Sequence, residues 1–338
     1  MIRTLKLMVC ALVLCVTATA SAQSLNGAGA TFPNPIYQKW FSEYSSMHGV
    51  QINYQSLGSG AGIRQVIAGT VDFGATDGPM SDEQLKQAPT KILHIPTVLG
   101  SVVPAYNIPG VKKELKFTPE LLAAIFLGKI TNWNDSQIAS VNPGIKFPDK
   151  AIVVVHRSDG SGTTYCFTDY LSKVSPEWNS TVGKNTSVKW PAASSIGGKG
   201  NEGVAGTIRQ IEGSIGYVEL IYAAQNDISY GTVKNKRGNF VKASLASTTA
   251  AATAAAANMP ADYRVSITDA DGKDAYPIAS FTWLLIPQQS KDAAKGKVLH
   301  DFLAWMLSMG QREATDLSYA PLPKEVAKKV QATIATIH

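Results

Sequence analysis

The sequence predicts an α/β protein built from two lobes. Segments with helical spacing alternate along the chain with short apolar segments typical of strands. The chain has 338 residues, which is enough for two lobes that each bury a hydrophobic core. Two long apolar segments, residues 98–106 and 279–286, are strand candidates that can carry the chain from one lobe to the other.

Residues 1–22 have the pattern of a signal peptide. Arg3 and Lys6 form a basic start, residues 7–22 carry no charge, and Ala20-Ser21-Ala22 is the small-x-small pattern of a cleavage site. The apolar part is too short, and too polar at its end, for a membrane span. We therefore expect cleavage after Ala22 and export from the cytoplasm.

The charge of the exported chain excludes some classes of partner. Cleavage leaves 338 − 22 = 316 residues, and loss of Arg3 and Lys6 reduces Lys plus Arg from 31 to 29 against 25 Asp plus Glu, a net charge of about +4. The basic residues form no run, so we expect no nucleic-acid interface. A small positive charge modestly favours encounter with small anions.

The cysteines and histidines point to neither a disulfide nor a metal. Cys10 and Cys15 lie in the signal segment, and Cys15 lacks the small preceding residues that lipoprotein processing requires, so no lipid anchor is expected. Cys166 alone cannot form an internal disulfide. The five histidines are scattered without ligand spacing, so we expect no metal site.

The first elements after the signal segment form a βαβ unit. A helix is predicted where large apolar residues recur at helical spacing from Ile36 to Tyr44. Residues 50–54 alternate like a strand, residues 63–68 are helical, and residues 71–75 form the next strand.

Later elements continue the same alternation. Residues 118–127 and 293–309 have helical spacing, and the β-branched residues 152–155 predict a strand that precedes another helix. The Ala/Thr-rich segment 245–257 is predicted to be a surface helix, with a disordered loop as the alternative.

The segment Arg157-Ser-Asp-Gly-Ser-Gly-Thr-Thr164 carries the strongest indication of function. It joins the strand at 152–155 to the next helix, and a helix start presents unpaired N–H groups and a partial positive charge to an anion. Ser161 and Thr163 add hydroxyl donors, and Arg157 adds a permanent cation with a planar fork of donors. Asp159 can pair with that fork. We predict an oxyanion site, with an ordinary capped turn as the alternative.

Two further helix starts have the same character. Gly27-Ala-Gly-Ala-Thr-Phe-Pro33 precedes the first helix, with Thr31 predicted as its N-cap. Ser59-Gly-Ala-Gly62 follows the strand at 50–54 and opens the next helix. If the three starts converge, they surround one anion with backbone and hydroxyl donors.

Asp77 lies just past the strand at 71–75, where a carboxylate can act as a specificity filter. Phosphate near neutral pH keeps at least one proton that the carboxylate can accept, whereas sulfate keeps none. A buried carboxylate therefore disfavours sulfate, because two desolvated negative charges would face each other. The alternative is an ordinary turn residue before Gly78.

Enzymatic motifs are not found in the sequence. No Gly-x-Ser-x-Gly elbow, Walker motif or HExxH motif occurs. The Gly-rich segment 197–206 lacks Rossmann and Walker spacing and is assigned no ligand contact. We therefore expect a binding protein without a cofactor rather than an enzyme.

Several of these motifs together resemble the periplasmic phosphate-binding proteins of bacterial phosphate ABC transporters. The resemblance spans the mature chain and rests on segments 27–33, 71–77, 127–133, 157–163, 197–201 and 216–219. It implies a periplasmic-binding-protein-like fold of type II, with two α/β lobes joined by two crossing hinge strands. The lobes are then residues 23–99 plus 278–338 and residues 100–277.

The resemblance also implies a ligand, a site and partners. The protein then holds inorganic phosphate between its lobes and delivers it from the periplasm to membrane permease subunits, which a cytoplasmic ATPase drives. It is expected to be a monomer. The implied phosphate-binding residues are Thr31, Phe32, Ser59, Asp77, Arg157, Ser161, Gly162 and Thr163. Asp159 is implied to orient Arg157, and Phe32 to donate through its backbone N–H.

Three other classes remain open from the sequence. A binder of sulfate or another oxyanion would use helix starts without a carboxylate acceptor, so Asp77 argues against it. A secreted phosphatase would need a nucleophile and usually metals. A surface phosphate-binding scaffold on the same fold is the third, because fold alone does not define function.

Overall fold

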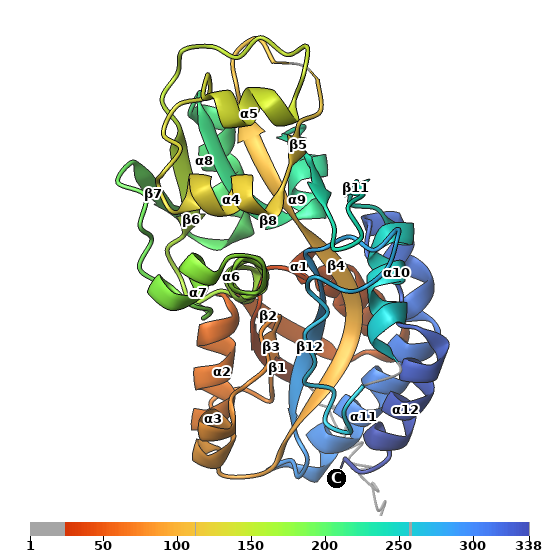
Figure 1. The fold of residues 1–338 in the computed structure, drawn as a ribbon. Coiled ribbons are helices and arrows are strands. Elements are labelled where there is room, and N and C mark those ends of the chain that lie inside the picture. The colour runs from red at the N-terminus through yellow and green to blue at the C-terminus, as the bar shows by residue number, and fades with distance from the viewer. Residues whose placement is uncertain (1–23, 112, 257–258, 338) are drawn as a thin grey trace, which may run out of the picture.

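The computed structural model describes residues 24–111, 113–256 and 259–337, so the predicted signal peptide lies outside the described residues. Two lobes lie one above the other and are linked by the long strand β4 (Ile92–Asn107), which runs from the lower lobe into the upper one in Figure 1. Strand β12 (Ala279–Pro287) pairs with it along its lower part.

The first lobe begins with the predicted βαβ unit. Its parallel strands are β1 (Ser24–Gly29), β2 (Gln51–Ser56) and β3 (Phe73–Thr76). Its helices are α1 (Asn34–His48), α2 (Ser59–Ala68), α3 (Asp82–Gln87), α11 (Ala293–Ser308), the 3-10 helix at Gly310–Leu317 and α12 (Lys324–Ile334). The apolar face predicted for α1, from Ile36 to Tyr44, is buried.

The second lobe has the same α/β construction. Its strands are β5 (Lys116–Phe117), β6 (Val153–Arg157), β7 (Ser195–Gly198), β8 (Ser214–Glu219), β9 (Ser229–Tyr230), β10 (Thr232–Lys234) and β11 (Phe240–Val241). Its helices are α4 (Pro119–Phe126), α5 (Ser136–Val141), α6 (Gly162–Val174), α7 (Pro176–Thr181), α8 (Gly200–Gln210) and α9 (Leu220–Gln225).

One sheet continues through both lobes. Its strand order is β2-β1-β3-β12-β4-β8-β6-β7, with β9 added on β4, and β11-β10-β5 form a separate small sheet. Strand β4 pairs antiparallel with β12 over residues 92–101 and with β8 over residues 102–107. The two predicted crossing segments are therefore strands, and both strands are longer than their apolar patterns indicated.

The pairing of β4 with β12 contains a bulge. Thr282 pairs with Val98 and Trp283 pairs with Pro96, so Thr97 is an extra residue on β4. Pro96 has no N–H to give to a regular ladder, which makes a bulge favourable here. Thr97 is buried, and its hydroxyl donates to the carbonyl of Thr282 at 3.2 Å.

Helix α10 (Leu245–Ala256) confirms the helical prediction for the Ala/Thr-rich segment. It is more than a surface helix, because Thr248, Ala251 and Ala252 are buried and the Thr248 hydroxyl lies 2.7 Å from that of Ser101 on β4. Its small side chains allow this close packing.

The chain also reaches the first lobe earlier than the predicted boundary at residues 277–278. The Tyr263 hydroxyl bonds that of Thr333 on α12 at 2.7 Å, and Arg264 Nη1 donates to the carbonyl of Met80 at 2.9 Å. These contacts tie the segment before β12 to the first lobe, although Ser266 and Thr268 also bond Asp169 of the second.

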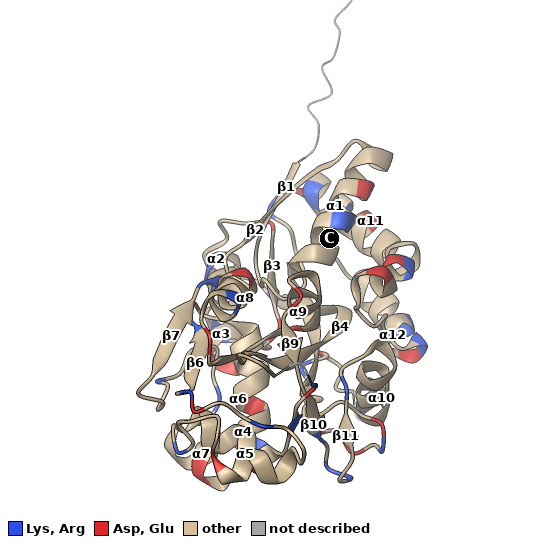
Figure 2. Ribbon diagram, turned by 90° about the horizontal axis from the view of Figure 1, so that it is seen from above, with Lys and Arg blue, Asp and Glu red and all other residues tan. Residues whose placement is uncertain are grey.

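Basic and acidic residues are interspersed over the outer helices (Figure 2). In the described part of the chain, no helix combines the length and the apolar character that crossing a membrane requires. Within the same residues, no group of three or more His, Cys, Asp or Glu side chains is placed to hold a metal ion.

Candidate anion-binding site between the lobes

The three predicted helix starts meet where the lobes face each other. Seven of the predicted residues (Thr31, Phe32, Ser59, Asp77, Ser161, Gly162 and Thr163) are buried, and Arg157 is 5% exposed. Hydrogen bonds cross between the lobes: the Gly162 N–H donates to Ser59 Oγ at 2.9 Å and the Gly60 N–H to the carbonyl of Gly160 at 2.9 Å. In Figure 1, α6 accordingly lies directly above α2.

Three tyrosines fix the backbone of residues 30–32. The Tyr54 hydroxyl donates to the carbonyl of Ala30 at 2.7 Å, Tyr222 to that of Thr31 at 2.5 Å, and Tyr319 to that of Phe32 at 2.6 Å. Burial raises the pKa of all three tyrosines well above the usual value, so the hydroxyls stay protonated donors.

These three hydrogen bonds determine which backbone groups of residues 30–32 can contact an anion. With each carbonyl of residues 30–32 turned toward a tyrosine hydroxyl, the carbonyl oxygens are kept from facing an anion. A segment held in this way suits anion binding through its N–H groups. Tyr222 comes from α9 in the second lobe, so closure of the lobes completes the set.

The prediction of Thr31 as N-cap of the first helix is wrong. The helix begins at Asn34 after Pro33 as the capping residue, and the Asn34 N–H donates to the carbonyl of Thr31 at 3.1 Å in a preceding turn. The side chain of Thr31 is engaged elsewhere: its Oγ1 accepts from the backbone N–H of Asn201 at 3.2 Å and from Asn201 Nδ2 at 2.8 Å.

Ser59 is the first residue of α2, after Gly58. Its Oγ accepts from the Gly162 N–H at 2.9 Å and from the Asp77 N–H at 3.3 Å, so it links all three parts of the site. Gly58 has a φ of 95°, and a Cβ there would lie 2.1 Å from Asp159 Oδ2. Only glycine allows α2 to begin this close to the opposite lobe.

Arg157 and Asp159 form the predicted pair. Arg157 Nε donates to Asp159 Oδ1 at 2.8 Å and Nη2 to Oδ2 at 2.5 Å, while Nη1 donates to Thr163 Oγ1 at 3.3 Å. Burial raises the pKa of Asp159, but its bonds to Arg157 outweigh this, and the pKa is lowered. The carboxylate therefore stays ionised and fixes the guanidinium beside the start of α6.

The start of α6 is built as the sequence predicts. Ser161 is the N-cap, and its Oγ accepts from the Thr164 N–H at 3.0 Å. Gly162 follows, and a Cβ there would lie 2.5 Å from Asp77 Oδ2, so glycine lets the helix start approach the carboxyl group. The geometry confirms the helix start; phosphate contacts of these residues stay a prediction.

Asp77 faces this helix start from the end of β3 and is 1% exposed. Its Oδ1 accepts from the Thr282 hydroxyl at 2.8 Å. Burial raises its pKa from 3.8 to about 7, although Thr282, the charge of Arg157 and Ser59 lower it. Near neutral pH, the carboxyl group is therefore placed to share one proton with a ligand.

Several residues of the site were not predicted from the sequence. Asn201, Thr282, Tyr222 and Tyr319 contact predicted site residues, and Tyr54 contacts Ala30 next to Thr31. Asn201 lies in the Gly-rich segment that was assigned no contact, at the start of α8, so the glycine pattern was its available signal. Tyr222 and Tyr319 lie 191 and 287 residues from their partners, and sequence spacing gives no indication of such pairs.

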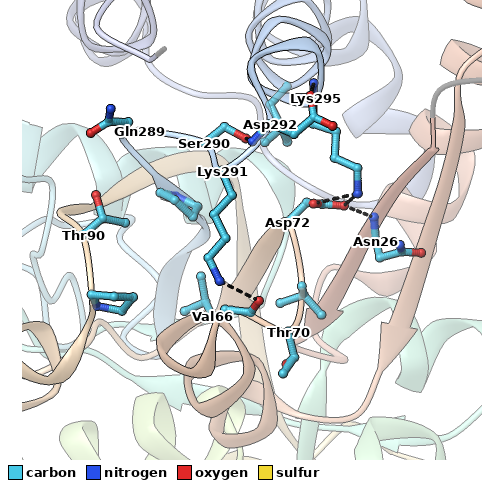
Figure 3. A pocket seen from close by; sticks show the side chains of 15 residues that line it. Asn26, Val66, Thr70, Asp72, Thr90, Gln289, Ser290, Lys291, Asp292 and Lys295 are labelled. Atoms are coloured by element: carbon cyan, nitrogen blue, oxygen red, sulfur yellow. Dashed lines mark hydrogen bonds and ion pairs between the residues drawn. The ribbon is translucent and has the colours of Figure 1, made fainter.

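A separate cavity of about 340 Å³ lies in the first lobe (Figure 3). Its lining includes Asp72, Lys291 and Lys295 and none of the predicted site residues. Lys295 Nζ pairs with both oxygens of Asp72 at 3.0 Å, and Lys291 Nζ donates to the carbonyl of Gly69 at 3.3 Å. Both lysines are thus engaged with the protein.

The molecule has two lobes on a continuous sheet, and helix starts, an arginine and one buried carboxyl group converge between them. These features define the class of hinged, two-lobed anion-binding proteins. Comparison with known proteins agrees with this class. A family model described as a PBP superfamily domain matches residues 16–309. The fold is that of the type II periplasmic binding proteins.

Relatives that cover most of the chain are named as phosphate-binding proteins. The phosphate-binding protein PstS of Pasteurella multocida is 48% identical over 315 residues, covering 93% of this chain and 90% of that protein. That of Haemophilus influenzae is 46% identical over 314 residues, covering 93% of each. A solved high-affinity periplasmic phosphate-binding protein, bound with phosphate at pH 8.5, has a TM-score of 0.76 at 24% identity and covers 92% of this chain and 93% of its own.

The chain belongs to the phosphate-binding protein family of the PBP superfamily.

Proposed function

We propose that this protein binds inorganic phosphate between its lobes and delivers it to the permease subunits of a phosphate ABC transporter, which a cytoplasmic ATPase drives. It acts in the periplasm as a monomer, after cleavage of the signal peptide at Ala22. The family membership and the names of the relatives support this role, and they favour a binding protein over an enzyme.

The proposed site combines donors from both lobes. Thr31, Phe32 and Ser59 donate from the first lobe, and Arg157, Ser161, Gly162 and Thr163 donate from the second. Asp159 keeps Arg157 in position through two hydrogen bonds. Because the donor set is complete only when the lobes meet, phosphate stabilises the closed state and shifts the hinge equilibrium toward it.

The buried carboxyl group of Asp77 is the main observation that favours phosphate over sulfate as the ligand. Every other predicted ligand group is a donor, and a donor-only site would accept sulfate as readily. Asp77 is an acceptor at 1% exposure, opposite the start of α6. A protonated anion satisfies it, whereas ionised Asp77 and fully ionised sulfate repel each other in a desolvated site.

The test is calorimetric titration of the mature, phosphate-stripped protein at pH 8 with phosphate and, separately, with sulfate. We expect one-to-one binding of phosphate and clearly weaker binding of sulfate. In Asp77→Asn, the loss of one hydrogen bond to a charged group should weaken phosphate binding by about 10- to 100-fold, corresponding to roughly 1.5–3 kcal/mol, and strengthen sulfate binding.

Asp72→Asn is the matched control, since Asp72 pairs with Lys295 outside the site and its replacement should leave phosphate binding unchanged. Equal binding of both anions by the wild type would contradict the assigned specificity. Binding of neither would favour the surface scaffold alternative, and wild-type behaviour of Asp77→Asn would remove the role given to Asp77.

A further inference from the structure

We propose that Asn201 is a positioning residue that determines specificity: it makes the hydroxyls of Thr31 and Thr163 obligatory donors, and for Thr31 it does so only when the lobes are closed. This inference rests on the proposed phosphate function. It concerns a residue that touches two predicted ligand groups from opposite lobes.

The hydroxyl of Thr31 has both of its acceptor positions filled by Asn201. Its Oγ1 accepts from the Asn201 backbone N–H at 3.2 Å and from Asn201 Nδ2 at 2.8 Å. A hydroxyl has two acceptor lone pairs and one donor hydrogen. With both lone pairs used, Thr31 can offer a ligand only its hydrogen.

The hydroxyl of Thr163 is in the same state. Its Oγ1 accepts from Asn201 Nδ2 at 3.1 Å and from Arg157 Nη1 at 3.3 Å. The two hydrogens of one amide group thus serve two threonines, one from the segment before α1 and one from the first turn of α6. Thr163 is likewise left with its hydrogen as the group it can present.

The orientation of the Asn201 amide is fixed by a third bond. Its Oδ1 accepts from the Glu219 N–H at 2.9 Å, and the opposite orientation of the amide would place the NH₂ group against that N–H. Asn201 is completely buried at the start of α8, so water does not compete for these bonds. The amide is held from the second lobe and reaches across to Thr31.

This geometry links specificity to closure. With the lobes apart, Thr31 loses both donors from Asn201, and its hydroxyl is free to accept as well as to donate. Closure converts it to a donor only. In the closed site, Thr31 and Thr163 then favour unprotonated anion oxygens, and Asp77 is left as the acceptor for the ligand proton.

The experiment is a double-mutant cycle on phosphate binding with Asn201→Ala and Thr31→Val. In the wild-type background, Asn201→Ala should weaken phosphate binding by about 10- to 100-fold, the range expected when hydrogen bonds to a charged ligand are lost. In the Thr31→Val background, the same change should have an effect at least about fivefold smaller, because one of its two targets is gone. Independent effects of the two changes would mean that Asn201 does not act on phosphate binding through Thr31.

Two further variants complete the design. Asn142→Ala removes a buried asparagine of the second lobe that also makes three hydrogen bonds, to Lys116 and Ile138, and it should leave phosphate binding unchanged. Asn201→Asp keeps the side-chain volume and the acceptor for Glu219 but cannot donate when ionised. It should therefore lose at least as much affinity as Asn201→Ala, and it serves if circular dichroism shows that the alanine variant does not fold.

The outcomes separate this inference from the proposed function. Wild-type affinity in both Asn201 variants, or effects of Asn201→Ala and Thr31→Val that simply multiply, would overturn the inference while phosphate binding by the wild type stands. A wild type that does not bind phosphate would overturn the proposed function and this inference together. A reduced effect in the Thr31→Val background supports the inference.

Discussion

At the residue scale, the site depends on one carboxyl group kept close to its titration point. Asp77 lies in the interior at the end of β3, and burial raises its pKa to about 7 against the lowering influence of Thr282 and Arg157. A carboxylate with its usual pKa would be fully ionised at neutral pH. Here a small change of pH changes whether Asp77 accepts or donates.

The discrimination against sulfate should therefore depend on pH. Sulfate does not titrate near neutrality, so its binding is coupled to proton uptake by Asp77. At pH values above the pKa of Asp77, the affinity for sulfate should rise about tenfold for each pH unit of acidification, and it should level off below about pH 7. Titration of sulfate from pH 8.5 to 5.5 measures this slope. Asp77→Asn should bind sulfate with no such slope, and a flat profile in the wild type would show that Asp77 does not set the discrimination.

At the scale of the element, the start of α6 contributes both to the stability of the fold and to the proposed phosphate binding. Ser161 caps the helix through Thr164, while Thr118 caps α4 in the same way through Leu121, outside the site. Ser161→Ala and Thr118→Ala should each lower the free energy of unfolding by about 1 kcal/mol.

Phosphate binding distinguishes the two caps. Ser161→Ala should weaken it by about tenfold or more through the lost ligand contact, and Thr118→Ala should not change it. Chemical denaturation and calorimetry of both variants measure the two effects. Equal affinity in the two variants would reduce Ser161 to a structural cap.

The helix starts at Ser59 and Ser161 could be predicted because their signals are local: a strand, glycines and a hydroxyl lie within a few residues. Thr31 has the same local pattern but does not cap a helix, because the Asn201 donors occupy its oxygen and α1 starts three residues later. Such a donor belongs to tertiary packing, which the spacing of neighbouring residues does not encode.

At the scale of the whole molecule, closure depends on glycines that let the lobes touch. A Cβ at Gly160 would lie 3.1 Å from the Cα of Gly60 in the opposite lobe. The lobe arrangement itself was predictable, since its long apolar strands and βαβ unit are visible in the sequence. The position of α10 was not, because an Ala/Thr-rich segment carries no pattern that selects one lobe.

Gly160→Leu should act as a wedge between the lobes. Overpacking at a tight contact costs roughly 1–3 kcal/mol, so phosphate binding should weaken by about 5- to 100-fold. In small-angle scattering with saturating phosphate, the variant should keep a larger radius of gyration than the wild type. Gly206→Leu, which adds a side chain where no atom lies within 4 Å of the Cβ, should behave as wild type in both measurements. A compact Gly160→Leu with unchanged affinity would contradict closure through this contact.

The bulge at Thr97 has a consequence for how this chain can change over evolutionary time. Successive residues of a regular strand point to opposite faces, so adding or removing a residue outside the bulge would exchange the two faces of β4 on one side of the change. Removing Thr97 itself would leave Pro96 and Val98 adjacent in a regular ladder. It would still remove the hydrogen bond from Thr97 to the carbonyl of Thr282 and so disturb the support of Asp77. Substitutions along β4 can be absorbed one at a time, whereas a deletion or insertion within it cannot. Lineages of this protein should therefore vary in the composition of the crossing strand and in the lengths of their surface loops, but keep the number of residues in that strand constant.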